Sequence, residues 1–170
     1  MESALRSRLP ERRDALLIAA AAVGVNLFGA VGVPFTATGS AWFAALELPW
    51  YYPPNWAFGV VWPILYAMIG AAAALVYLAG RDGAAGSGRV RTALGLFAVQ
   101  LVVNVAWSPV FWGLERPDLG LVVLGALIAL VVATMVAFAR VDRRAALLLV
   151  PYFAWNCFAT ALNYGIWALN

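Results

Sequence analysis

Aromatic rings and side-chain amides recur at helical spacing along three apolar segments of the chain. Residues three, four or seven positions apart share one face of a helix. Three segments carry such stripes: Phe58, Trp62, Tyr66 and Ile69; Gln100, Asn104, Trp107, Ser108 and Phe111; and Trp155, Ala159, Asn163 and Ile166. A further apolar segment offers Asn26, with Ala22 and Ala30 one helical turn to either side. Converging stripes would enclose an apolar cavity with a few hydrogen-bonding groups, which suits a flat hydrophobic ligand.

The same residues have simpler interpretations. Tryptophans near the ends of membrane spans often form a belt at the lipid–water interface, and Trp50, Trp112 and Trp167 fit that pattern. Buried amides such as Asn26 and Asn104 often only bond neighbouring helices. Spacing alone leaves both interpretations open.

Much catalytic chemistry is excluded by what the chain lacks. It has no histidine and one cysteine, Cys157, which we expect to be a small buried hydrophobe. Ser-His-Asp and Cys-His catalysis are therefore excluded, and so are a histidine-ligated haem and a cysteine metal cluster. We predict no metal site.

The elements that position these stripes are membrane-spanning helices. The chain of 170 residues is 65% hydrophobic and only 11% charged, too apolar for a soluble domain. A helix needs about 20 apolar residues to cross a bilayer. Five segments without an internal Asp, Glu or Arg meet that need: 15–35, 57–79, 92–112, 119–139 and 145–169. We predict an all-α membrane protein, one domain over residues 1–170, built as a bundle of five transmembrane helices.

The basic residues are all arginines, and their distribution predicts the topology. Ten of the eleven fall before span one, after span two or after span four, and only Arg116 falls on the other side. This positive-inside pattern places the N-terminus in the cytoplasm and the C-terminus outside. It explains the net charge of +3 without nucleic-acid binding. Span one is too long for the core of a signal peptide, so we expect it to remain as a helix.

The first loop, residues 36–55, is long and aromatic. Ser40 is placed to cap a short helix that ends before Pro49, and the prolines that follow stiffen the chain. We expect a partly ordered aromatic lid over the outer end of the bundle. In span four, Gly125, Ala129 and Ala133 begin a repeat of small residues, which suits packing within the bundle or a dimer face.

Three motifs in order along the chain resemble the TspO/MBR family, the tryptophan-rich sensory proteins related to the mitochondrial translocator protein. They are WFAALELPWYYPPNWAFGVVWPILY at 42–66, QLVVNVAWSPVFWG at 100–113 and PYFAWNCFATALN at 151–163. Each motif alone is weak, but the set is specific.

The resemblance implies a five-helix membrane protein, commonly dimeric, that binds tetrapyrroles such as protoporphyrin IX, or sterols. It implies a pocket among helices one, two, three and five beneath the first loop, with no obligatory cofactor and the porphyrin as ligand. The predicted ligand-binding residues, from motif position and helical spacing together, are Asn26, Trp42, Trp62, Tyr66, Asn104, Trp107, Ser108, Trp155, Ala159 and Asn163.

The chain departs from the family pattern where Leu48 replaces a usual lysine, which removes an ion-pair partner for a porphyrin propionate. Three functions follow from the resemblance. We rank a membrane receptor or sensor first and a transporter of porphyrin or lipid second. Third is light-dependent porphyrin breakdown, in which Trp107 and Trp155 would hold the porphyrin or donate electrons.

Overall fold

The computed structural model describes residues 12–170, and most of these residues are helical, with no strand among them. Arg6 and Arg8, which belong to the predicted basic leader, lie outside the described residues. Five helical segments are long and apolar enough to cross a membrane, as predicted. They are α2 (Arg12–Gly29) with η1 (Ala30–Phe35), α4 (Asn55–Arg81), α5 (Ser87–Ser108) with η2 (Pro109–Gly113), α6 (Pro117–Ala139), and α7 (Arg143–Leu148) with α8 (Val150–Leu169).

The helices agree with the predicted spans to within a few residues, but three of them are composite. The change of helix type or the break falls close to a proline in each: Pro34 lies inside η1, Pro109 begins η2, and Pro151 follows the break between α7 and α8. Proline has no backbone N–H and cannot continue the regular hydrogen-bond ladder. The apolar runs predicted the spans, and each of the three changes of helix geometry falls close to a proline, whereas α4 continues through Pro63.

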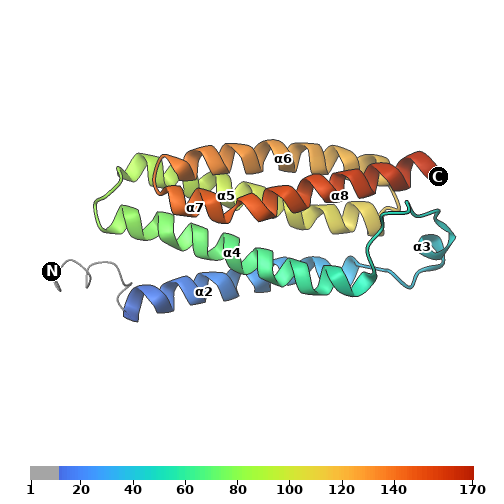
Figure 1. The fold of residues 1–170 in the computed structure, drawn as a ribbon, viewed down its shortest axis with the longest axis horizontal. Coiled ribbons are helices and arrows are strands. Elements are labelled where there is room, and N and C mark those ends of the chain that lie inside the picture. Colours follow the sequence, from blue (N-terminus) through green and yellow to red (C-terminus); the bar gives the residue numbers. More distant parts are fainter. Residues whose placement is uncertain (1–11) are drawn as a thin grey trace.

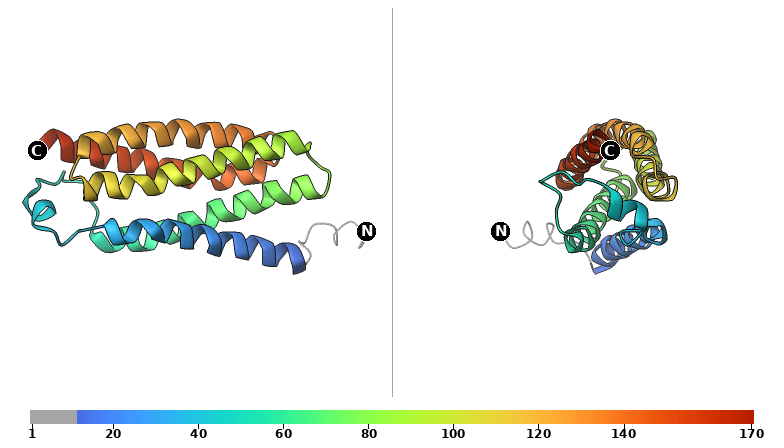
Figure 2. Two further views of the ribbon diagram at one scale, coloured as in Figure 1. Left: turned by 180° about the vertical axis from the view of Figure 1, so that it is seen from behind. Right: turned by 90° about the vertical axis from the view of Figure 1, so that its right-hand side faces the viewer.

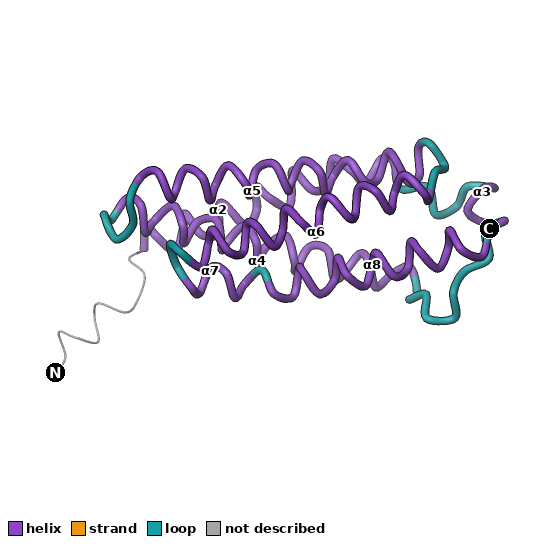
Figure 3. Tube along the Cα trace, turned by 90° about the horizontal axis from the view of Figure 1, so that it is seen from above, coloured by secondary structure: helices purple, strands orange, loops and turns teal. Residues whose placement is uncertain are grey.

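The segments run alternately up and down the bundle (Figure 1). Helices α2 and α4 pack on each other, and α6 packs on both α5 and α8; Figure 2 shows the same arrangement from behind and end-on. We call residues 36–54 the lid segment and the end of the bundle that holds it the lid end. The C-terminus lies there too, and the link from α4 to α5 lies at the opposite end (Figure 3).

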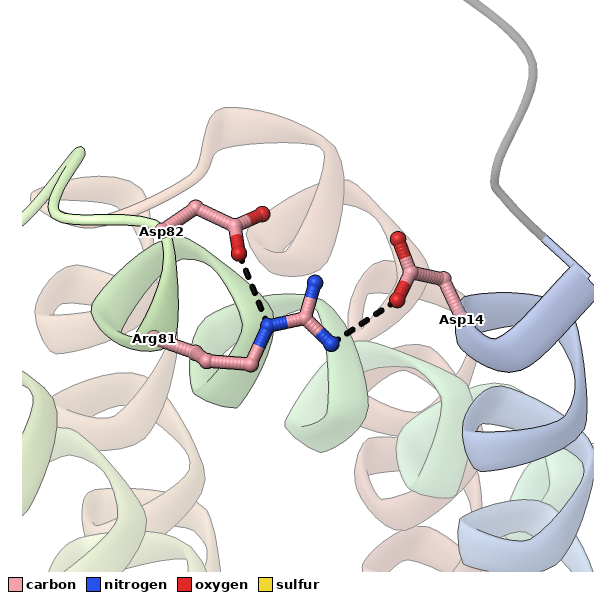
Figure 4. Close-up of polar contacts among 3 residues, drawn as sticks. All are labelled: Asp14, Arg81 and Asp82. Atoms are coloured by element: carbon pink, nitrogen blue, oxygen red, sulfur yellow. Dashed lines mark hydrogen bonds and ion pairs between the residues drawn. The ribbon is translucent and has the colours of Figure 1, made fainter.

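The opposite end carries most of the arginines, and we call it the arginine end. Figure 4 shows Arg81 at this end, where it joins α4 to the start of α2. Its Nη1 donates to Asp14 Oδ1 at 2.9 Å, and its Nε donates to Asp82 Oδ1 at 2.8 Å. Asp142 accepts the backbone N–H of Arg144 at 2.8 Å and caps α7. The up-and-down order therefore gathers the described arginines, except Arg116, at one end, as the sequence pattern requires.

The two halves of the bundle are filled differently. Apolar side chains such as Ile69, Val76 and Phe138 are fully buried and fill the half toward the arginine end. At Gly70, α2 and α4 approach so closely that a Cβ would lie 2.7 Å from the carbonyl oxygen of Ala21. Cys157, expected to be buried, is exposed on α8. That expectation was wrong because Cys157 lies on the outward face of the helix, beside rather than on the inward stripe.

The lid segment is ordered and tied to α8. Its short helix α3 (Ala41–Ala45) begins after Ser40, whose Oγ accepts the N–H of Phe43 at 3.2 Å, as predicted for the cap. Asn170 bonds Glu47 in both directions, at 3.0 Å to its N–H and 3.1 Å to its carbonyl oxygen. The Tyr51 hydroxyl donates to the carbonyl of Ala161 at 3.0 Å. These bonds hold the lid against the C-terminal helix.

Candidate functional site

A cavity of about 510 Å³ lies between the helices toward the lid end. Residues of α2, η1, the lid segment, α4, α5, η2, α6 and α8 line it. Its volume falls within the range of about 300–1,000 Å³ that is typical of small-molecule sites. The expected position beneath the first loop, among spans one, two, three and five, agrees with this geometry. Span four adds to it, because Leu124 and Leu127 of α6 also line the cavity.

Nine of the ten predicted ligand-binding residues line this cavity: Asn26, Trp62, Tyr66, Asn104, Trp107, Ser108, Trp155, Ala159 and Asn163. Trp42 does not. Its ring packs edge-on against Phe111 and Trp112, with centroids 5.6 Å and 6.2 Å away. Both of those residues line the cavity, so Trp42 supports the wall from behind.

One aromatic wall is built by α4 and α8. The rings of Trp62 and Tyr66 stack, with centroids 5.3 Å apart and an interplanar angle of 28°. Trp155 meets Trp62 edge-on at 6.4 Å and Phe58 at 5.8 Å. These rings lie one turn apart on α4 and meet α8 at its inward face, which is why helical spacing predicted them.

A second aromatic wall is built by α5 and η2. Trp107 stacks on Phe111, with centroids 4.8 Å apart and an interplanar angle of 21°. The η2 segment is a π-helix, and the N–H of Leu114 closes it on the carbonyl of Pro109 at 3.0 Å. Single π-helical turns inside an α-helix are common at functional sites. Here Trp112 is buried and lines the cavity, so the interfacial-belt interpretation was wrong for this residue.

Asn163 fixes the position of Trp107. The Trp107 indole N–H donates to Asn163 Oδ1 at 3.0 Å, and Asn163 Nδ2 donates to the carbonyl of Pro117 at 2.7 Å. Gly120 makes room for this pair, since a Cβ there would lie 2.6 Å from Asn163 Oδ1. Asn163 therefore links the tryptophan to the first residue of α6, and its two hydrogen bonds make it a positioning residue.

Two other predicted amides also bond within the protein. Asn26 Nδ2 donates to the carbonyl of Ala22 at 3.0 Å and to that of Pro63, on α4, at 3.2 Å. The Tyr66 hydroxyl donates to Asn104 Oδ1 at 2.7 Å, which joins α4 to α5. Each amide thus bonds a neighbouring helix and also lines the cavity. Bonding a neighbouring helix and lining the cavity are therefore compatible roles for these amides.

Other polar groups near the cavity lack a partner among residues 12–170. These are the Trp155 indole N–H and Asn156 Oδ1, both buried, on two residues that line the cavity. Sequence reasoning missed Asn156 because it lies off the predicted stripe. Gln100, which lies on a stripe, does not line the cavity. It is fully buried and accepts the hydroxyl of Tyr152 at 2.9 Å.

The lining contains no Asp, Glu, Lys or Arg among the described residues. The lid contributes Thr36, Thr38 and Tyr52. Burial raises the pKa of the Tyr52 hydroxyl, so this group stays protonated at neutral pH and can donate a hydrogen bond. The walls can therefore stack on flat rings and orient neutral polar groups, but they offer no ion pair.

Five membrane-length helices around an aromatic cavity define a class of multi-pass membrane protein with an internal cavity. The sequence model of the TspO/MBR family matches residues 16–168. "Tryptophan-rich protein TspO" of Chlorobaculum tepidum is 41% identical over 157 residues, which cover 91% of this chain and 97% of that protein. The chain belongs to the TspO/MBR family.

Two further relatives show the breadth of the family. The "Tryptophan-rich sensory protein" of Cereibacter sphaeroides is 37% identical over 154 residues, covering 88% of this chain and 92% of that protein. The human "Translocator protein" is 38% identical over 132 residues, covering 78% of this chain and 76% of that protein. The matches confirm the resemblance inferred from the three motifs.

Proposed function

We propose that this protein is a membrane receptor or sensor that binds a flat hydrophobic ligand, a tetrapyrrole such as protoporphyrin IX, in the aromatic cavity. The observation that carries the proposal is the pair of walls, Trp62 with Tyr66 on one side and Trp107 with Phe111 on the other. Ring stacking favours planar ligands, and each aromatic pair adds about 0.5–1.5 kcal/mol beyond area burial.

The polar groups at the cavity refine the expected ligand. Amides and hydroxyls lie along the walls without a basic residue among them. The buried part of the ligand is then neutral, and the propionates of a porphyrin would meet hydroxyls, amides or water toward the lid. The names of two relatives, a sensory protein and a translocator protein, fit sensing and transport respectively.

A titration with protoporphyrin IX in the dark, followed by tryptophan fluorescence, tests the proposal. Saturable quenching with a porphyrin that stays intact in light supports a receptor or a carrier. Protein-dependent bleaching under illumination would favour porphyrin breakdown instead. Uptake of porphyrin into vesicles that contain the protein separates a carrier from a receptor. The absence of saturable quenching would refute tetrapyrrole binding.

Trp107→Ala and Trp155→Ala are each expected to weaken protoporphyrin binding about tenfold, because each removes one stacking partner from the cavity. Trp167→Ala is the matched control, since this tryptophan is 49% exposed and does not line the cavity. The measurement is the dissociation constant beside the thermal unfolding temperature. If both cavity variants lose thermal stability and neither shows a selective loss of binding, these residues only pack the core.

We propose that the arginine end faces the cytoplasm and the lid end faces outward. The support is the gathering of arginines around the links that follow α4 and α6. In a Cys157→Ser background, Gly39→Cys of the lid segment should react with a membrane-impermeant maleimide on intact cells. Ala84→Cys, at the opposite end, should react only after lysis. The reverse pattern would overturn the proposed orientation.

We also propose a homodimer, as the family resemblance implies. Gly125 and Ala129 are exposed on α6 and are available for close helix contact. Chemical crosslinking in native membranes should yield a species of twice the mass. Monomers alone, at crosslinking efficiencies that capture a known dimer, would refute it.

A further inference from the structure

A second hollow lies on the outer surface of the bundle toward the arginine end. It is a groove of about 470 Å³ between α6 and the α7–α8 segment, which pack side by side (Figure 1). Its apolar walls are Met135, Val136 and Ala139 from α6, with Ala146, Leu147 and Val150 from α7 and α8. Val136, Leu147 and Val150 are 47%, 68% and 44% exposed, so the groove opens away from the bundle. In a membrane this surface faces lipid.

The remaining lining residue is Arg143, the one charged group in the groove. The neighbouring acid is already engaged, because Asp142 Oδ2 accepts from Arg144 Nη2 at 2.9 Å. Within residues 12–170, neither Arg143 nor Arg140 forms an ion pair. The groove therefore carries one arginine, Arg143, that has no acidic partner among the described residues.

The length of the groove along α7 and α8 matches the length scale of a lipid head and upper chain. Arg143 begins α7, and Val150 lies seven residues further along. At 1.5 Å per residue this separation is about 10 Å along the helical direction. A phosphate at Arg143 would then place the glycerol and the first acyl carbons against Leu147 and Val150. Basic pockets of this type, on the side of the membrane rich in arginine, suit anionic lipid head groups.

We propose that this groove binds an anionic glycerophospholipid of the surrounding bilayer, with its phosphate on Arg143 and one acyl chain between α6 and α7–α8. The charge of Arg143 selects an anionic over a zwitterionic head group. A second copy of the chain is a poor occupant of the groove, because a symmetric contact there would bring Arg143 of both copies together. The dimer contact proposed at Gly125 and Ala129 lies nearer the lid end of α6. This site is separate from the aromatic cavity, and it does not depend on what the cavity binds.

The test compares purified wild-type protein with Arg143→Gln in detergent, with phosphatidylglycerol or phosphatidylcholine added. Native mass spectrometry counts the bound lipids, and thermal unfolding measures the stabilisation. We expect phosphatidylglycerol to bind and to raise the unfolding temperature more than phosphatidylcholine does. Its affinity should fall about fivefold in Arg143→Gln, which corresponds to the worth of one basic residue at a membrane surface.

Two further variants distinguish lipid binding in the groove from a general effect of the protein's charge. Arg91→Gln makes the same charge change at an exposed position on α5, and it should keep the wild-type preference. Ala139→Phe fills the groove from an exposed position without altering charge, and it should lose the bound phosphatidylglycerol. Equal binding of both lipids by the wild type, or an unchanged preference in Arg143→Gln, overturns the proposal. Protoporphyrin quenching should remain unchanged in all three variants, so a failed lipid site is distinguishable from a failed cavity.

Discussion

Gly70→Ala is expected to lower the free energy of unfolding by about 3 kcal/mol, the upper part of the range for overpacking a tight contact. A Cβ at this position would lie 2.7 Å from the carbonyl oxygen of Ala21 and 2.8 Å from Cα of Ala22. Both atoms belong to backbone, so no side-chain rotation relieves the contact. Helices α2 and α4 must move apart, and the cavity then loosens because α2 carries Asn26.

Gly24→Ala is the matched control for this prediction. It lies on α2, the helix that Gly70 of α4 approaches, and a Cβ there would meet nothing within 4 Å. Thermal unfolding in detergent should show a large loss for Gly70→Ala and little change for Gly24→Ala. Protoporphyrin affinity should fall in the first variant and not in the second. Wild-type stability of Gly70→Ala would contradict the close approach of α2 and α4.

Ala159→Phe is expected to reduce protoporphyrin affinity by about a hundredfold, or about 2.8 kcal/mol. Ala159 lies on the inward stripe of α8 one turn after Trp155, and it lines the cavity. A phenyl ring there would occupy space that the ligand needs, while the neighbouring apolar residues can accept the ring. Stability should therefore change far less than binding, which the fluorescence titration and thermal unfolding measure together.

Ala154→Phe controls for the added ring. It lies on the same helix but is exposed on the outer face, and it does not line the cavity. This variant should bind protoporphyrin as the wild type does. Undiminished binding by Ala159→Phe would place the ligand elsewhere on the protein, whereas equal losses in both variants would indicate a general effect of enlarging α8.

The sequence predicted the fold well because hydrocarbon imposes a simple rule. A chain must bond its backbone internally to cross lipid, so a long apolar run without charge predicts a helix. The same periodicity predicted the faces that meet, including Trp155, Ala159 and Asn163 on α8. The long first loop and its prolines predicted the lid, and Ser40 caps the short helix as expected.

The details that the sequence did not predict depend on how deeply a side chain is buried and on local backbone geometry. Gln100 shares a face with Asn104, but Tyr152 covers it, and periodicity cannot separate a cavity wall from the core beneath it. The π-helical turn brings Trp112 to the cavity, whereas regular helical spacing left it at a span end. Asn156 follows Trp155 directly, off the stripe, and only the converging helices place both on the cavity.

The most direct test of the cavity as the ligand site uses the indole N–H groups of the eight tryptophans. Two-dimensional ¹H–¹⁵N spectra in micelles resolve one indole signal each, and single Trp→Phe variants assign them. Protoporphyrin added in the dark should shift the signals of Trp62, Trp107 and Trp155, which line the cavity. Trp50, which is 95% exposed on the lid, and Trp167 should stay in place. Shifts confined to the exposed tryptophans, with the cavity signals unchanged, would contradict the account.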